Sequence, residues 1–280
     1  MFLMFSFSTF GQENMTFLKN WKTYPVPTNK DTIRKYNSAK SDWMVYYEED
    51  EIRVDDIRNL KINPIAKLPF DVFQSSYEVK DINGEKHIIV TGPEEGGVDV
   101  VEVKDGYLIG FNRGEWGGDL YWFSKNGKEK YKISGHQIVQ FIKRDNKIYA
   151  IEGLAHLSMS RGSIIEIEKK EGKWITKEFL KLPTAPEVIQ LDSKENFIVV
   201  TFGTDWSFDK GGKSVIHATP GLFSIDRKAN IVTLVKDGIW GDDLYPSSMV
   251  IQNDVVYIGM RKGVYKFDLV TKRDEWLLPE

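Results

Sequence analysis

The chain has 280 residues, of which 41% are apolar, so it can form a folded core and is not wholly disordered. Its formal charge of −3 leaves no basic excess to neutralise phosphates, and we expect no nucleic-acid partner. The chain contains no cysteine, which excludes disulfides, thiolate metal sites and cysteine nucleophiles. Nothing in the sequence implies a cofactor.

The N-terminal segment, residues 1–12, has the pattern of a truncated signal peptide. Met1 to Phe10 are almost all apolar or small, and the chain turns polar at Gln12 and Glu13. We therefore predict export to the periplasm or the exterior of a bacterium, with cleavage near Gly11 or Gln12. A basic n-region is missing, so we expect the true start to lie upstream; the alternative is a buried N-terminal strand. The apolar run is too short to cross a bilayer, and we expect a chain that does not span the membrane.

Residues 13–42 are polar and rich in turn formers, and we interpret them as a leader that precedes a single domain over residues 43–280. Short apolar segments in this domain alternate with polar residues, which is typical of half-buried strands. Before residue 98 the pattern predicts strands that could form one group with irregular links. These strands are 42–50, 51–57, 76–81 and 86–92.

From residue 98 onward the sequence predicts four groups of four strands. Each group has a tight polar turn, a longer middle loop and a second tight turn. The first turns centre on Asp105, Asp145, Glu195 and Asp254. Asp-Gly and Asn-Gly pairs at such turns tolerate the positive φ that hairpins require. The predicted groups are 98–135, 137–182, 186–236 and 247–278.

Repeated groups of four strands about 40–50 residues apart resemble the blades of β-propellers. The resemblance covers residues 43–280, and the loops GEWGG (Gly114 to Gly118) and GLAHLSMSRG (Gly153 to Gly162) are similar to those of uncharacterised bacterial propeller-like proteins. It implies an all-β fold of five four-stranded blades, with four or six as alternatives. Such a ring closes by pairing strands from the two ends of the chain. The superfamily includes enzymes and binders, so the fold alone implies no activity.

Strand alternation places the middle loops and the connections between groups at one end of the domain, opposite the tight turns. Loops on a rigid scaffold commonly carry function, and these are rich in aromatic and charged residues. We expect Trp116, His156 and Trp206 to surround a common pocket there. The candidate ligand-binding residues are Arg113, Glu115, Trp116, Asp119, Glu152, His156, Arg161, Asp205, Trp206, Trp240, Asp243 and Arg261.

Three functions fit this set of residues. The leading hypothesis is an exported, non-catalytic binding propeller that recognises a glycan, a small polar ligand or a protein. The second is a carbohydrate-active hydrolase, in which two of the acids act as a catalytic pair and tryptophan rings stack on sugars. The third is a protein that neutralises or escorts one partner. A purely structural role is the alternative for each residue, since aspartate holds turns and tryptophan packs between blades. The histidines lack metal-motif spacing, so we predict no metal site.

Overall fold

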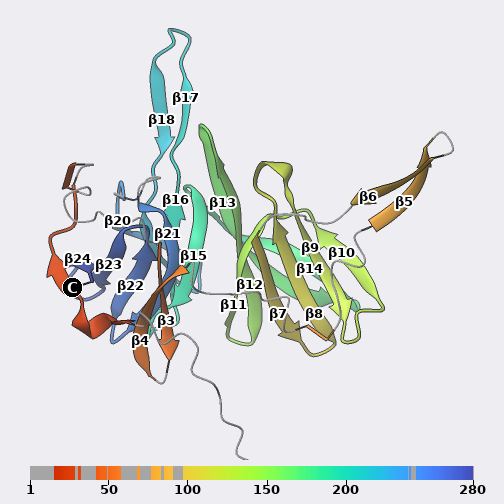
Figure 1. Ribbon diagram of the computed structural model, residues 1–280, viewed down its shortest axis with the longest axis horizontal. Coiled ribbons are helices and arrows are strands. Elements are labelled where there is room, and N and C mark those ends of the chain that lie inside the picture. The colour runs from red at the N-terminus through yellow and green to blue at the C-terminus, as the bar shows by residue number, and fades with distance from the viewer. Residues whose placement is uncertain are drawn as a thin grey trace, which may run out of the picture. The chain divides into compact units, whose positions relative to one another are not determined.

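The computed structural model describes residues 16–28, 31–32, 42–48, 50–57, 68–69, 77–82, 85–90, 97–238, 240 and 244–279. The described part of the chain is all-β, with several four-stranded antiparallel sheets (Figure 1). The chain forms two compact units. The terminal unit combines residues 1–60 with 247–280, and the central unit comprises residues 61–246. The single domain over 43–280 stays a prediction.

Three four-stranded antiparallel sheets form the core of the central unit. The first contains β7 (Gly97–Val103), β8 (Gly106–Asn112), β9 (Gly118–Ser124) and β10 (Lys130–Ser134). The second contains β11 (Ile138–Arg144), β12 (Lys147–His156), β13 (Met159–Lys170) and β14 (Lys173–Leu182). The third contains β15 (Ala185–Leu191), β16 (Phe197–Phe202), β19 (Leu222–Ile225) and β20 (Ile231–Val235).

The described residues of the central unit also form two separate hairpins and a short 3₁₀ helix. One hairpin pairs β17 (Asp205–Phe208) with β18 (Ser214–Ala218), and the other pairs β5 (Tyr77–Ile82) with β6 (Glu85–Val90). The 3₁₀ helix η5 (Gly114–Trp116) lies between β8 and β9.

In the terminal unit, segments from both ends of the chain pack together. A five-stranded sheet has the order β2 (Lys22–Tyr24), β24 (Asp274–Leu278), β23 (Gly263–Asp268), β22 (Val255–Met260) and β21 (Pro246–Gln252). A three-stranded sheet has the order β1 (Thr16–Phe17), β4 (Glu51–Asp56) and β3 (Trp43–Glu48), and η1 (Leu18–Asn20) follows β1. The leader therefore contributes β2 as a neighbour of the last strand.

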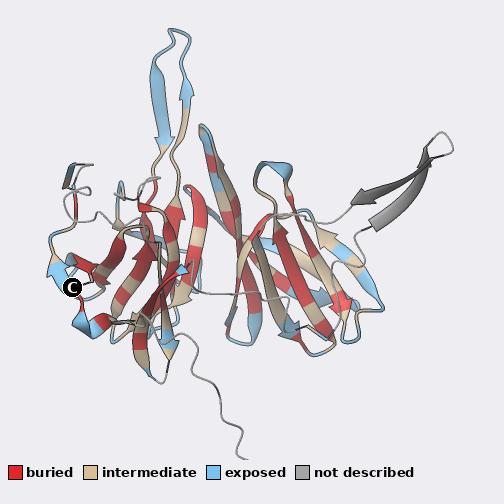
Figure 2. Ribbon diagram, in the orientation of Figure 1, coloured by how far each residue is buried: buried red, intermediate tan, exposed pale blue. Residues whose placement is uncertain are grey.

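The strand composition follows from what each face of a sheet contacts. In β12, Ile148 and Ala150 belong to the apolar cluster shared with the first sheet, whereas Tyr149 and Ile151 belong to the cluster shared with the third. Because both faces of the second sheet are buried, this strand is a continuous apolar run rather than an alternating one. Figure 2 shows buried residues concentrated along the middle strands of these sheets.

The limits of the first three predicted groups from residue 98 onward agree with the four-stranded sheets to within two residues. Those of the fourth agree with β21 to β24, which share a five-stranded sheet with β2. The expected turns are also present. Asp145 and Asn146 both have positive φ, 52° and 60°, and form the two-residue connection between β11 and β12. Asn253 and Asp254 have φ of 52° and 60° between β21 and β22. Left-handed conformations at both central positions define the turn type that matches strand twist.

The proposed fifth group is wrong as a single sheet. The four strands predicted there are present as β3, β4, β5 and β6, but β3 and β4 pair in the terminal unit, whereas β5 and β6 form a hairpin in the central unit. The two pairs are separated in sequence by residues 57–76. Period-2 patterning locates strands correctly but contains no information about which pair shares a sheet.

A second correction concerns the residues 153–162, which we predicted to form a long loop. They continue β12 and β13, and only Leu157 and Ser158 connect the strands. The two glycines that indicated a loop, Gly153 and Gly162, are cross-strand partners. A Cβ added to them would lie 2.9 and 2.3 Å from Cδ of Pro186 in the third sheet. Glycine is needed there because a neighbouring backbone approaches closely.

Candidate functional site

The first candidate site is the loop end of the central unit, defined by η5, the Leu157–Ser158 turn and the β17–β18 hairpin. Gln137, a buried residue before β11, donates from Nε2 to the Gly114 carbonyl at 2.6 Å and so fixes η5 to the second sheet. The Glu115 carboxylate lies 3.0 Å from Nε2 of His156 at the end of β12. The backbone N–H of Trp206 donates to the Ser158 carbonyl at 2.9 Å. These contacts join the three elements.

Trp116, His156 and Trp206 therefore lie on three connected elements, whereas the common pocket expected around them stays a prediction. The third middle loop, however, is largely a hairpin. Trp206 lies opposite Ile216 across it, and the Trp206 and Phe208 rings meet edge to face with centroids 5.0 Å apart. In Figure 1 the β17–β18 hairpin projects beyond the ends of β16 and β13.

Exposed apolar side chains gather at the loop end. Trp116 is 80% exposed and Leu157 is 88% exposed, although tryptophan and leucine are usually buried. Phe208 and Ile216 are 65% and 64% exposed on the same face of the hairpin. A two-stranded hairpin has no core of its own to cover such a face. We call this set the apolar loop-end surface; its members are Trp116, Leu157, Met159, Phe208 and Ile216.

The acids predicted at this end are engaged by neighbouring groups. Asp119 is buried and forms ion pairs with Arg113, at 2.5 Å, and with Lys132. Glu152 accepts a hydrogen bond from the Ser163 hydroxyl at 2.6 Å. Asp205 accepts one from the backbone N–H of Ser160 at 3.5 Å. With Glu115 beside His156, all four described acids of the set contact a polar or charged partner.

The remaining predicted residues have different surroundings. Trp240 is fully buried, and its indole Nε1 donates to the Thr201 carbonyl at 2.8 Å, so no ring face is available to a ligand. Arg161 is exposed on β13, and Asp243 lies outside the described residues. Arg261 belongs to the terminal unit, where its Nε lies 2.9 Å from the Asp42 carboxylate.

The structure also shows polar groups on the first strands of the sheets that the sequence patterns did not reveal. Asp99 in β7 accepts the Phe141 N–H of β11 at 2.6 Å, and Gln140 in β11 accepts the Ile189 N–H of β15 at 3.0 Å. Burial raises the pKa of Asp99, although the Phe141 and Val100 N–H groups partly oppose the shift. Polar side chains therefore join the first strands of successive sheets.

Glu187 occupies the corresponding position in β15, two residues after the strand begins, as Asp99 and Gln140 do in their strands. Its carboxylate accepts a hydrogen bond from the Tyr245 hydroxyl. Burial raises the pKa of Glu187 to about 7, and this hydrogen bond lowers it by a smaller amount. The sequence does show Glu187 as a single acid inside the apolar run Ala-Pro-Glu-Val-Ile, which could have indicated a buried carboxyl group.

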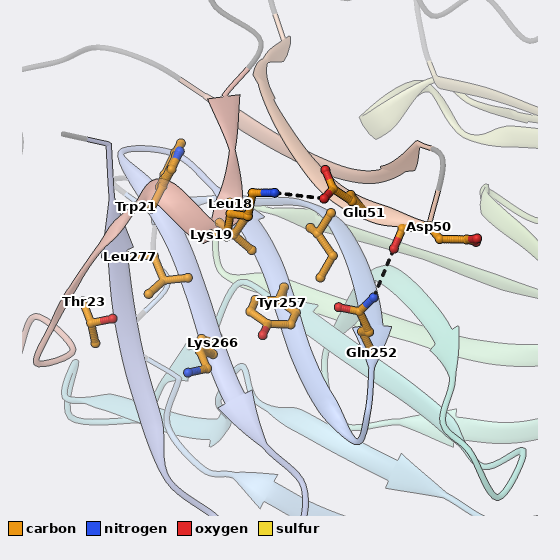
Figure 3. Close-up of a pocket in the computed structure, with 11 residues that line it drawn as sticks. Leu18, Lys19, Trp21, Thr23, Asp50, Glu51, Gln252, Tyr257, Lys266 and Leu277 are labelled. Atoms are coloured by element: carbon orange, nitrogen blue, oxygen red, sulfur yellow. Dashed lines mark hydrogen bonds and ion pairs between the residues drawn. The ribbon is translucent and has the colours of Figure 1, made fainter.

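A cavity of about 390 Å³ lies in the terminal unit (Figure 3). Trp21 and Tyr257 contribute aromatic surface, and Trp21 also packs edge to face on Trp43 with centroids 4.9 Å apart. The Lys19 ammonium pairs with Glu51 at 2.9 Å at the rim, and Gln252 donates to the Asp50 carbonyl at 3.4 Å. None of these residues was among the predicted site residues, because the leader was not expected to form part of a cavity.

Comparisons with known proteins add little to this geometry. No family model matches the sequence, and no curated protein matches it. Among solved structures, the tricorn protease aligns with 84% of this chain and 26% of its own at 12% identity and a TM-score of 0.35. MPT-4, a mannose phosphorylase from Leishmania mexicana, aligns over 73% of each chain at 9% identity and a TM-score of 0.34. The chain thus spans about a quarter of the tricorn protease chain. No helix in the described residues is long and apolar enough to cross a membrane.

Proposed function

We propose that the protein is an exported, non-catalytic binding protein of propeller architecture whose loop end binds a partner protein. Successive four-stranded sheets with buried faces support the architecture. The observation that carries the binding function is the apolar loop-end surface, which collects exposed side chains from three separate elements. Monomeric proteins seldom leave such side chains together in water unless they contact something.

The surroundings of this surface favour a protein over a glycan or a small polar ligand. The Arg113–Asp119 ion pair and the contact between the Glu115 carboxylate and His156 lie at the same end as Trp116. An apolar centre with a polar rim of mixed charge is the usual composition of a protein–protein interface. In addition, among the described strands β18 pairs only with β17, so its outer edge can accept an extended segment of a partner. A neutralising or escorting role would use the same surface.

The partner can be found and the surface tested in the native host. A photoreactive phenylalanine analogue at position 208 should crosslink a protein that the same group at position 232, on the exposed face of β20, does not. With that protein purified, the double variant Phe208→Ser/Ile216→Ser should bind it about tenfold more weakly or worse, because central apolar contacts dominate binding energy.

The matched control is Ile231→Ser/Val232→Ser, which removes two exposed apolar side chains from β20 instead. It should leave the dissociation constant unchanged. Equal crosslinking from positions 208 and 232 would argue against the loop end as the interface. An unchanged dissociation constant in the hairpin variant would do the same. Selective binding of an oligosaccharide that Trp116→Ala abolishes would instead favour the glycan hypothesis.

Export is a separate part of the proposal, supported by the apolar run Met1 to Phe10, which lies outside the described residues. Expressed from its own gene in the native host, the protein should be recovered outside the cytoplasm. Mass spectrometry of the mature chain should find its N-terminus near Gln12 or Glu13. An intact N-terminus on cytosolic protein would refute export and leave the binding surface untouched.

A further inference from the structure

The cavity in the terminal unit is large enough to hold a small molecule. Its volume of about 390 Å³ lies within the range of sites for small organic ligands. Its apolar wall belongs to the buried cluster of the unit, to which Leu18, Ile52 and Leu277 contribute from η1, β4 and β24. Tyr257 of β22 packs against the same cluster. The cavity shares no residue with the apolar loop-end surface.

Tyr257 brings an unused hydrogen-bonding group into the cavity. The residue is half-buried, and among the described residues its hydroxyl has no hydrogen-bond partner. The hydroxyl oxygen keeps accessible surface, in contrast to the buried and unpaired indole nitrogen of Trp43. Burial raises the pKa of Tyr257, although the Lys266 ammonium partly opposes the shift. A hydroxyl that has lost part of its water without gaining a protein partner is available to a ligand.

Ion pairs supply the polar groups around Tyr257. Figure 3 shows this ring between the Lys19–Glu51 pair and Lys266. The Lys19 ammonium lies 2.9 Å from the Glu51 carboxylate, and the Lys266 ammonium lies 2.6 Å from that of Glu275. Each pair presents a donor beside an acceptor and adds no net charge. The cavity therefore favours a ligand whose neighbouring groups both donate and accept hydrogen bonds.

We propose that this cavity binds a neutral pyranose sugar. A sugar hydroxyl both donates and accepts, so two adjacent hydroxyls match the carboxylate and the ammonium of one ion pair. The C–H face of the sugar ring would pack on Tyr257 and Leu277, because an aromatic ring offers a large apolar surface with a polar tip. Asp50, the remaining charged residue of the lining, is exposed and disfavours an anionic sugar. The site is independent of the partner-binding surface.

The probes are the methyl pyranosides of glucose, galactose, mannose and N-acetylglucosamine, titrated into the isotope-labelled native chain. At least one of them should shift the amide NMR signals of Tyr257 and Leu277 until the site is saturated. Cyclohexanol has the ring without adjacent hydroxyls, and glycerol has adjacent hydroxyls without the ring. Each should bind at least about tenfold more weakly than that sugar, because charge-assisted hydrogen bonds and a buried ring both contribute to affinity. The corresponding uronate should also bind more weakly, since Asp50 repels it.

A free sugar and the end of a glycan chain share this chemistry, and a disaccharide separates the two sources. The disaccharide ends in the sugar that binds. If the cavity receives the end of a chain, the disaccharide should bind at least as tightly as the methyl glycoside, because its second ring extends into solvent. If the cavity receives a free sugar, the second ring should prevent binding.

Conservative variants test the named groups without removing a ring. Tyr257→Phe lacks only the hydroxyl and should bind the sugar about threefold more weakly or worse. Glu51→Gln keeps the shape but offers a neutral acceptor, and it should bind about fivefold more weakly or worse. The matched control is Tyr121→Phe, which removes a tyrosine hydroxyl from β9 in the central unit and should bind normally. Trp116→Ala should also bind normally, which separates this cavity from the apolar loop-end surface.

Several results would overturn the proposal. If none of the glycosides shifts the Tyr257 and Leu277 signals of the native chain, the site is refuted, whether or not the variants fold. Cyclohexanol of equal affinity would show that the cavity recognises an apolar ring and no sugar. Undiminished binding in both Tyr257→Phe and Glu51→Gln would place the site elsewhere. These three results leave the partner-binding surface untouched, whereas loss of binding in Trp116→Ala would move the sugar to the loop end and count against a protein partner there.

Discussion

Replacing Trp240 with alanine is expected to destabilise the protein by about 3–5 kcal/mol, the usual cost of removing a large buried aromatic side chain. The ring is fully buried, and Nε1 donates to the Thr201 carbonyl at 2.8 Å. Thr201 is itself buried and hydrogen-bonds through Oγ1 to Thr184, at 2.7 Å, and to the Gly221 N–H, at 3.0 Å. The substitution therefore leaves both a cavity and an unsatisfied carbonyl beside this network. Urea unfolding followed by circular dichroism measures the loss.

Trp116→Ala is the matched control, because the sequence indicated the same role for both rings. Trp116 is 80% exposed on η5, so its removal should change the free energy of unfolding by less than about 0.5 kcal/mol. Trp240→Phe should retain much of the packing while losing the hydrogen bond, and its stability should fall between the other two. Equal destabilisation by Trp116→Ala and Trp240→Ala would mean that the loop end is part of the core rather than an interaction surface.

The strands and turns were predictable from sequence because both depend on local chemistry. Turn residues such as Asp145-Asn146 indicate where the chain reverses, and strand patterns indicate which segments lie between the turns. Together they predict the limits of the sheets. Sheet membership was less predictable. The strands at 43–56 and 77–90 look equivalent in sequence, yet they pair separately, since pairing depends on tertiary contacts.

The candidate site was only partly predictable, because the sequence does not distinguish a tryptophan or glycine in an exposed loop from one in the core. Gly153 and Gly162 indicated a loop but instead allow Pro186 to approach the second sheet. Arg144 and Glu187 were missed because the sequence does not show what surrounds their side chains. Arg144 precedes a tight turn and was interpreted as part of it, although its side chain folds back among aromatic rings. The apolar loop-end surface could be identified only from the structure, because the sequence did not show that residues 205–218 form a hairpin.

The stability of the protein should fall as the pH rises from about 4.5 to about 7, in part because of Glu187. Burial raises the pKa of this carboxyl from 4.5 to about 7 in the folded state. The folded protein therefore binds more protons than the unfolded chain in this range, so the free energy of unfolding falls across it as the pH rises. Asp99 contributes in the same direction, since burial raises its pKa as well. Below pH 4.5 the Glu187 contribution is fully present, and above pH 7 it is lost.

Glu187→Gln should remove the Glu187 part of this dependence, because glutamine keeps the shape and still accepts a hydrogen bond from the Tyr245 hydroxyl without ionising. At pH 8 the variant should be more stable than the native chain by up to about 3 kcal/mol, the equivalent of the shift in pKa, and the difference should vanish near pH 4.5. Unfolding free energies measured in urea at several pH values test this directly. Glu168→Gln, which alters an exposed acid on β13, should show no such trend. A Glu187→Gln variant that is less stable than the native chain at pH 8 would show that the ionised carboxylate stabilises the fold, and that the Tyr245 hydrogen bond outweighs the cost of burial.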